Sequence, residues 1–252
     1  MLANIRIVLV QTFHPGNIGS AARAMKTMGL NSLTLVNPRA FPDPEAARLA
    51  AGAQDILDSA RVVDSVAAAV SDCVQAVGAS ARLRSLPLPH YDEPEAMAAD
   101  VVFAARADPV ALVFGRERFG LTGEEIRCCS HQVSIPASPD YGILNLSQAV
   151  QVLTYELHQA WRRTRRYPTS PPDTAHFSAL SPATARQPSR EQMEHFYRHL
   201  GCVMHRSGFL TQPHARTEEH LRALFARAQP TRKELSLLRG LLASVEQHFP
   251  KE

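Results

Sequence analysis

Short apolar runs alternate with alanine-rich segments through the first 160 residues, and this alternation limits the fold more narrowly than any other feature. Several of the runs are apolar on both faces, which is typical of strands in a parallel sheet that helices cover on both sides. The sequence therefore predicts an open α/β fold with a parallel sheet. We expect strands at 5–10, 32–36, 73–80, 110–115 and 131–135, and helices at 18–28, 44–58, 64–71, 94–106 and 145–163.

The pattern changes after the long helix. Residues 164–190 contain five prolines and many Ser and Thr residues, a composition that cannot sustain a packed core and indicates a linker. Three amphipathic helical patterns follow, near 190–206, 217–228 and 231–248. We therefore divide the chain into an α/β domain (1–163), a flexible linker (164–190) and a small helical extension (191–252).

Charge is distributed unevenly between these parts. Residues 1–163 carry 14 Lys/Arg against 16 Asp/Glu, whereas residues 164–252 carry 13 against 8 and seven of the 11 histidines. A basic tail suggests an anionic partner, although a solvated helical face would have the same composition. The four cysteines lack CxxC spacing, so we expect a reducing, cytoplasmic location and no metal. We find neither an export signal nor a membrane span.

The segment "HPGNIGSAARAMKTMGL" (14–30) follows the first predicted strand and raises the question of a nucleotide site. A dinucleotide fingerprint needs GxGxxG, but here the spacing is Gly16-x-x-Gly19, the later acidic residue is missing, and no Walker Gly-Lys-Ser/Thr follows. What remains is Asn17 as a helix cap, Gly19 as a point of close approach, and Arg23 one turn further on. Taken alone, the segment is better explained as a capped helix with a surface arginine.

The segment "ALVFGRERFGLT" (111–122) ends a buried strand at Gly115 and places three charged residues before a second glycine. Ligands of open α/β sheets bind at such carboxyl ends of strands. The simpler interpretation is a polar turn before a short helix, with Thr122 as its cap.

The segment "IPASPDYGILNLSQAVQVLTYEL" (135–157) starts with a loop that two prolines stiffen and continues into the long helix. Asn145 and Ser147 stand at the start of that helix. Either residue could contribute to a site, and either could simply be the N-cap.

In this order, the three segments resemble the three motifs of the SPOUT RNA methyltransferases. The resemblance covers about the first 160 residues and rests on Asn17, Gly19 and Arg23, on "FGRERFGL" (114–121), and on "IP" followed by "LNLSQA" (144–149). Within that superfamily, "RIVLVQTFHPGNIGSAARAMKTMGL" and "GRERFGLTGEE" are most similar to the TrmJ-type tRNA 2′-O-methyltransferases. Those enzymes join a SPOUT domain to a helical extension through a flexible linker.

The resemblance implies a deep trefoil knot at the carboxyl end of the sheet, which composition and periodicity do not indicate. It also implies S-adenosylmethionine held in a bent shape inside the knot by loops at 78–82, 114–118 and 135–145, mainly through backbone groups. Family members often have a polar side chain at the position of Gly142. The cofactor contacts implied residue by residue are Ala79, Ser80, Ala81, Gly115, Ile135, Gly142, Ile143 and Leu144.

The resemblance assigns activation of the ribose hydroxyl to Arg23. Because a guanidinium is a poor proton acceptor, we expect it to clamp the adjacent phosphate and stabilise the developing alkoxide. Asn17 would orient Arg23 or the ribose. Glu117, Asn145 and Ser147 would complete the catalytic site.

The implied substrate is tRNA, at the pyrimidine-type nucleotide 32 of the single-stranded anticodon loop. SPOUT enzymes are homodimers, so we expect apolar positions of the long helix to form the dimer surface, unless they pack within the chain. Those positions are Val150, Leu153, Leu157 and Trp161. The expected RNA contacts are Arg23, Arg82, Arg84, Arg116, Arg162, Arg163, Arg165 and Arg166.

Three alternatives remain open at this point. The chain could be a SPOUT-like RNA-binding module without catalysis, although the joint presence of Asn17, Arg23, Glu117 and Asn145 argues against that. It could methylate another RNA site. A nicotinamide-dependent oxidoreductase is disfavoured because the dinucleotide fingerprint is missing.

Overall fold

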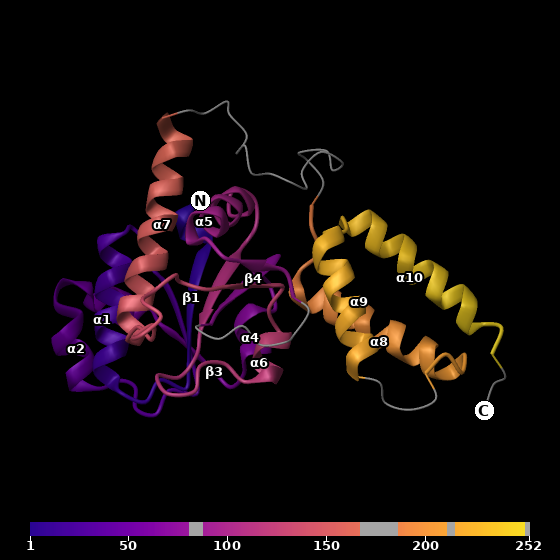
Figure 1. The fold of residues 1–252 in the computed structure, drawn as a ribbon, viewed down its shortest axis with the longest axis horizontal. Coiled ribbons are helices and arrows are strands. Elements are labelled where there is room, and N and C mark those ends of the chain that lie inside the picture. Colours follow the sequence, from indigo (N-terminus) through magenta and orange to yellow (C-terminus); the bar gives the residue numbers. More distant parts are fainter. Residues whose placement is uncertain (81–87, 167–185, 211–214, 250–252) are drawn as a thin grey trace.

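The computed structural model describes residues 1–80, 88–166, 186–210 and 215–249. A parallel sheet with helices on both faces forms one unit, and helices α8 to α10 form a second (Figure 1). Helix α7 and the C-terminal helices lie on opposite sides of the sheet unit (Figure 1). Ala81, Arg82, Arg84 and most of the predicted linker lie outside the described residues.

The described strands form one sheet in the order β3-β2-β1-β6-β4-β7-β5, with every neighbouring pair parallel. This confirms the predicted parallel sheet of an α/β fold, and the five predicted strands lie within two residues of their expected bounds. Strands β3 and β5 were missed because two or three residues are too short to show a periodic pattern. The strands are β1 Ile5–Val10, β2 Ser32–Val36, β3 Arg61–Val63, β4 Gln75–Ala79, β5 His90–Tyr91, β6 Val110–Phe114 and β7 His131–Val133.

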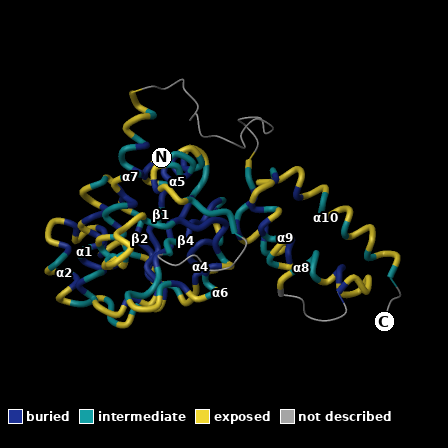
Figure 2. Tube along the Cα trace, in the orientation of Figure 1, coloured by how far each residue is buried: buried dark blue, intermediate teal, exposed yellow. Residues whose placement is uncertain are grey.

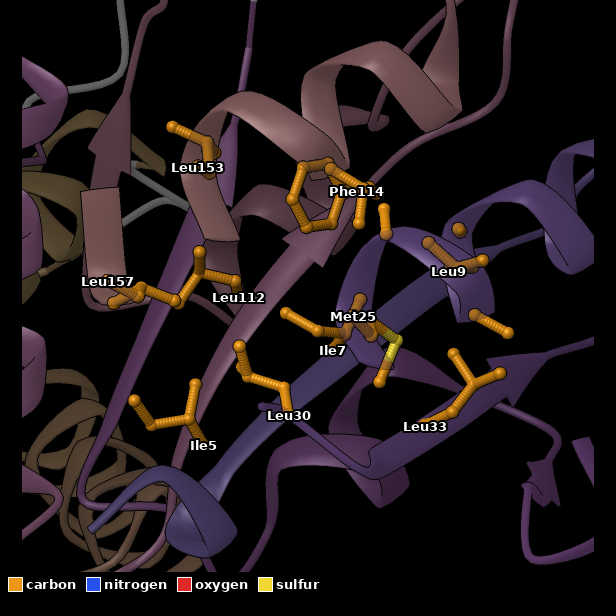
Figure 3. Packing of buried hydrophobic residues seen from close by; sticks show 14 of the residues in the cluster. Ile5, Ile7, Leu9, Met25, Leu30, Leu33, Leu112, Phe114, Leu153 and Leu157 are labelled. Atoms are coloured by element: carbon orange, nitrogen blue, oxygen red, sulfur yellow. The ribbon is translucent and has the colours of Figure 1, made fainter. Parts of the chain in front are cut away.

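Both faces of the central strands are buried, as their sequences predict. Along β1, Ile5, Ile7 and Leu9 join the core on one face of the sheet (Figure 3). Val8 and Val10 join the core on the other face. The first core is covered by α1, α2, α3, α5 and α7, and the second by α4 and α6 (Figure 2). These helices are α1 Pro15–Thr27, α2 Pro44–Ala50, α3 Gln54–Asp58, α4 Val66–Val70, α5 Pro94–Ala104, α6 Gly123–Arg127 and α7 Leu146–Arg166.

Helix α1 corrects two expectations. It begins at Pro15 with His14 as its N-cap residue, so Asn17 lies inside the first turn and is not the cap. A Cβ atom on Gly19 would lie 2.0 Å from the carbonyl oxygen of Ala46 and 2.9 Å from the backbone nitrogen of Ala50, both in α2. Gly19 therefore makes room for a neighbouring helix of the same chain, and the expectation of an external partner at this point was wrong.

Helix α7 corrects a third expectation, which concerns the apolar positions predicted to form a dimer surface. Val150, Leu153 and Leu157 are fully buried within the single chain, in the same core as residues of the sheet. Figure 3 shows Leu153 and Leu157 in this core. The prediction that they form a dimer surface was wrong, because their apolar stripe faces α1, α5 and the sheet. Trp161 is half-buried against the same core. The helix also continues to Arg166, three residues beyond the predicted domain boundary.

The three C-terminal helices α8 Arg190–Arg206, α9 Ala215–Ala228 and α10 Arg232–Glu246 match the three predicted patterns. Phe196 and Leu235 are the most deeply buried members of their small core. Arg190, only 7% exposed, attaches α8 to the sheet unit. Its guanidinium donates hydrogen bonds to the carbonyl oxygens of Cys128 (3.2 Å) and Cys129 (3.3 Å), and its backbone N–H donates to Cys73 O (2.8 Å).

Candidate active site

Because the sheet is parallel, the loops that follow its strands emerge at one edge. Leu9 of β1 and Ala79 of β4 both pair with Phe114 at the end of β6, and Ala79 also pairs with Val133 at the end of β7. The four loops after these strands therefore start side by side. They carry the three sequence motifs, so the motifs meet at the carboxyl edge of the sheet, as expected for ligand sites of this architecture.

The loop after β6 closes on itself within six residues. Gly115 is required there because a Cβ atom would lie 2.1 Å from the carbonyl carbon of Gly120. Gly120 has a φ of +64°, which favours glycine. Arg116 and Gly120 exchange backbone hydrogen bonds of 3.2 and 2.9 Å across the loop. The capping box of Thr122 and Glu125 then starts α6, which confirms Thr122 as the cap.

The tight loop directs Glu117 toward the start of α1. Its carboxylate accepts hydrogen bonds from the backbone N–H groups of Phe13 (3.1 Å) and His14 (3.1 Å) and from Nδ2 of Asn17 (2.9 Å). Burial pushes the pKa of Glu117 upward, but these three donors outweigh burial and hold the pKa below its ordinary value. Glu117 is therefore an ionised anchor at the positive end of a helix.

The same network reaches the start of α7. Oδ1 of Asn17 accepts a hydrogen bond of 3.1 Å from Nδ2 of Asn145. Oδ1 of Asn145 accepts from the backbone N–H and the hydroxyl of Ser147, at 2.8 and 2.7 Å. Asn145 thus has the position and side-chain hydrogen bond of the N-cap of α7 and is at the same time bonded to Asn17.

We name this set, Glu117, Asn17, Asn145 and Ser147, the polar network. It unites four of the five predicted catalytic residues. Arg23, the fifth, is exposed on α1, and among the described residues no hydrogen bond or ion pair involves its guanidinium. It lies six residues beyond Asn17, about 9 Å along the helix axis and about 120° around it.

The residues predicted to hold a cofactor lie on three neighbouring loops. Ala79 ends β4, and the backbone N–H of the following Ser80 donates to Val133 O at 3.0 Å. In the loop after β7, Ile135 and Leu144 are half-buried, whereas Ile143 is 63% exposed. Gly142 packs closely, since a Cβ atom there would lie 2.9 Å from Ser138 O.

The comparison with known proteins supplies the family. Residues 4–155 match the SpoU rRNA Methylase family, and residues 191–252 match the C-terminal domain of the tRNA methyltransferase TrmJ. A tRNA (cytidine/uridine-2′-O-)-methyltransferase TrmJ of Salmonella typhimurium is 47% identical over 248 residues, which cover 98% of each chain. The chain belongs to the TrmJ-type methyltransferases.

Solved structures of this family have the same fold along the whole chain. TrmJ from Z. mobilis has a TM-score of 0.77 at 30% identity, covering 96% of this chain and 98% of its own. A probable methylase family protein from Haemophilus influenzae has a TM-score of 0.64 at 41% identity, covering 98% of this chain and 97% of its own. The resemblance seen in the sequence is thereby confirmed.

The predicted RNA-contacting arginines of this TrmJ-type chain have different surroundings. Arg116 forms a two-pronged ion pair with Glu125, at 2.8 and 2.9 Å, and its Nε donates to Gln11 at 2.9 Å. Arg163 pairs with Glu95 on α5. A shallow surface hollow at the end of α7 is lined by His158, Trp161, Arg162, Arg165 and Arg166.

Arg165 lies over the Trp161 ring, 5.1 Å from its centroid. The end of α7 thus combines positive charge with an aromatic face.

In the described part of the chain, no three His, Cys, Asp or Glu residues are grouped so that they could hold a metal ion. No helix within the described ranges is both long and apolar enough to span a bilayer.

Proposed function

We propose that this protein methylates the ribose 2′-hydroxyl of nucleotide 32 in the anticodon loop of tRNA, with S-adenosylmethionine as the methyl donor. The polar network is the observation that carries the proposal, since it brings the residues of three distant motifs together at the carboxyl edge of the sheet. The names of the relatives, which specify tRNA cytidine and uridine, support the substrate.

The cofactor loops have suitable chemistry. An adenosine group needs apolar surfaces and backbone hydrogen-bond partners, and the loop after β7 exposes Ile143 (63%) and Tyr141 (87%) beside the backbone-rich ends of β4 and β6. Ala79, Ser80, Gly115, Ile135, Gly142, Ile143 and Leu144 would hold S-adenosylmethionine there, with Ala81 as a further contact. When bound, the cofactor supplies an electrophilic methyl group on a positive sulfur. We propose that this chain has the trefoil knot of SPOUT proteins and that the knot includes these loops.

The chain's own residues would orient the acceptor. Arg23 clamps the phosphate beside the target ribose and stabilises the negative charge that develops on the 2′-oxygen. A guanidinium has no site for an incoming proton, so Arg23 is not the base. Glu117 acts by keeping Asn17 in place, since its lowered pKa makes its carboxylate a weak proton acceptor.

We further propose a homodimer. Arg23 faces about 120° away from Asn17 around α1, so it is better placed to reach the polar network of a second subunit than that of its own. We also propose that residues 191–252 bind tRNA in the cytoplasm. The arginines and lysine exposed on these helices are Arg198, Arg206, Arg216, Arg227, Arg232, Lys233 and Arg239.

Methyl transfer to a tRNA transcript, with mapping of the methylated ribose, tests the proposal. We expect wild-type protein to modify nucleotide 32 and the Arg23→Ala variant to lose about 10²-fold or more in rate with S-adenosylmethionine affinity unchanged. Arg48→Ala is the matched control, because Arg48 is also exposed and lies on the adjacent helix α2. Transfer to another nucleotide would refute the position, and a parallel loss of cofactor binding would refute the role of Arg23.

A further inference from the structure

The loops that Glu117 joins also carry exposed aromatic rings that no step above uses. Phe13, three residues after the end of β1, is 51% exposed, although its backbone N–H donates to Glu117 of the polar network. Phe119, two residues after Glu117 in the loop after β6, is 76% exposed. Leaving a large apolar ring exposed to water is unfavourable, so the exposed half of Phe13, beside the polar network, is a surface that a binding partner can cover.

Phe13 is already half of a stacked pair. The guanidinium carbon of Arg39 lies over its ring, 3.9 Å from the centroid. Arg39 follows β2, and its backbone N–H donates to Thr12 O at 3.1 Å, which holds the loops after β1 and β2 together. The His14 imidazole meets the Phe13 ring edge-on, with centroids 4.9 Å apart. The ring is therefore fixed in place while half of its surface stays open to solvent.

We propose that the Phe13–Arg39 pair is a stacking platform for an unpaired RNA base next to the methylated nucleotide. This inference rests on the proposed function and adds a substrate contact to it. Unpaired bases in RNA loops are recognised by stacking on aromatic rings and guanidinium planes. A ring fixed beside the polar network, with a cation against it, has the chemistry for a flat, electron-rich base and for the neighbouring phosphate. Phe13 is thus a substrate-binding residue and takes no part in the chemical step.

The chain offers a matched control for this geometry. Phe103, near the end of α5, is 40% exposed, and Arg106 lies over its ring at 5.2 Å. This second pair lies at the amino edge of the sheet, where Asn4, which precedes β1, donates a hydrogen bond to Ala105 O. It has the same composition as the platform but is far from the cofactor loops.

The experiment compares full-length wild-type protein with Phe13→Leu, Phe13→Tyr and Phe103→Leu. Leucine keeps apolar bulk but removes the π face, whereas tyrosine keeps that face. We expect Phe13→Leu to raise KM for tRNA about tenfold, equivalent to about 1.4 kcal/mol, with kcat nearly unchanged. Phe13→Tyr should restore wild-type KM, and Phe103→Leu should leave it unchanged. Circular dichroism checks that each variant is folded.

A binding measurement tests whether Phe13 stacks on an RNA base, independently of catalysis. With 2-aminopurine at the unpaired loop position next to nucleotide 32, wild-type protein and Phe13→Tyr should quench its fluorescence, whereas Phe13→Leu should not. Equal quenching and equal KM in Phe13→Leu and wild type would overturn the platform while leaving the methyltransferase function intact. Absence of methylation by wild-type protein would instead overturn the function, and quenching would still decide whether Phe13 stacks on RNA.

Discussion

Replacing Gly19 with alanine tests whether this glycine serves helix packing or RNA approach. Its Cβ position lies 2.0 Å from the carbonyl oxygen of Ala46, whereas ordinary van der Waals contact begins at 3.4 Å. The atom that it meets is backbone, so no side-chain rotation can relieve the clash. Helix α2 must instead move away from α1, although both Ala46 and Ala50 are fully buried in that contact.

The magnitude follows from two opposing terms. Alanine in place of glycine inside a helix gains about 1 kcal/mol. Overpacking a buried contact costs about 1–3 kcal/mol, and more when backbone has to shift. We expect Gly19→Ala to lower the free energy of unfolding by about 2 kcal/mol, which corresponds to a fall of about 1 M in the urea midpoint.

Intrinsic fluorescence is a suitable assay because the single tryptophan, Trp161, packs against the same core as α1. Gly240→Ala is the matched control, since Gly240 lies inside α10 with nothing within 4 Å of its Cβ position. We expect Gly240→Ala to raise the free energy of unfolding by up to about 1 kcal/mol. Its unfolding is measured by circular dichroism. An unchanged midpoint for Gly19→Ala together with weaker tRNA binding would refute the packing argument and restore the sequence-based interpretation.

Two further substitutions test the contacts that hold the site and the second unit in place. Glu117→Gln removes a carboxylate whose pKa is lowered in the folded state, so the stability it contributes is fully present above the ordinary value of 4.5 and is lost as pH falls through the folded-state pKa. Urea midpoints should therefore differ between wild type and Glu117→Gln at neutral pH and converge below about pH 4.5; a pH-independent gap would contradict this. Arg190→Met keeps apolar bulk but leaves the carbonyls of Cys128 and Cys129 without their charged donor, at a cost of about 1–3 kcal/mol. Hydrogen exchange should then accelerate at the amides of 190 and 191 but not in Arg198→Met, an exposed arginine of the same helix, and equal protection would refute the anchoring role.

Much of the fold was readable in the sequence because it depends on local patterns. Apart from Arg6, the run "IRIVLV" is apolar on both of its faces, which is typical of a strand covered on both sides. The ordered motifs also predicted where the candidate site lies, since parallel strands bring their carboxyl ends to one edge. Strands β3 and β5 were missed because so few residues leave no period to detect.

The sequence by itself predicted five of the seven described strands, a parallel sheet, and the loops on which the candidate site lies. The tertiary structure decided what covers each surface. An apolar stripe on α7 has the same period whether a second subunit or its own sheet buries it, and Val150, Leu153 and Leu157 turned out to face the sheet. The tertiary structure also decided which polar groups pair with each other. The hydrogen bond between Glu117 and Asn17, for example, joins residues 100 positions apart. Periodicity encodes only that a face must be buried, whereas the identity of its partner depends on contacts between segments far apart in the chain.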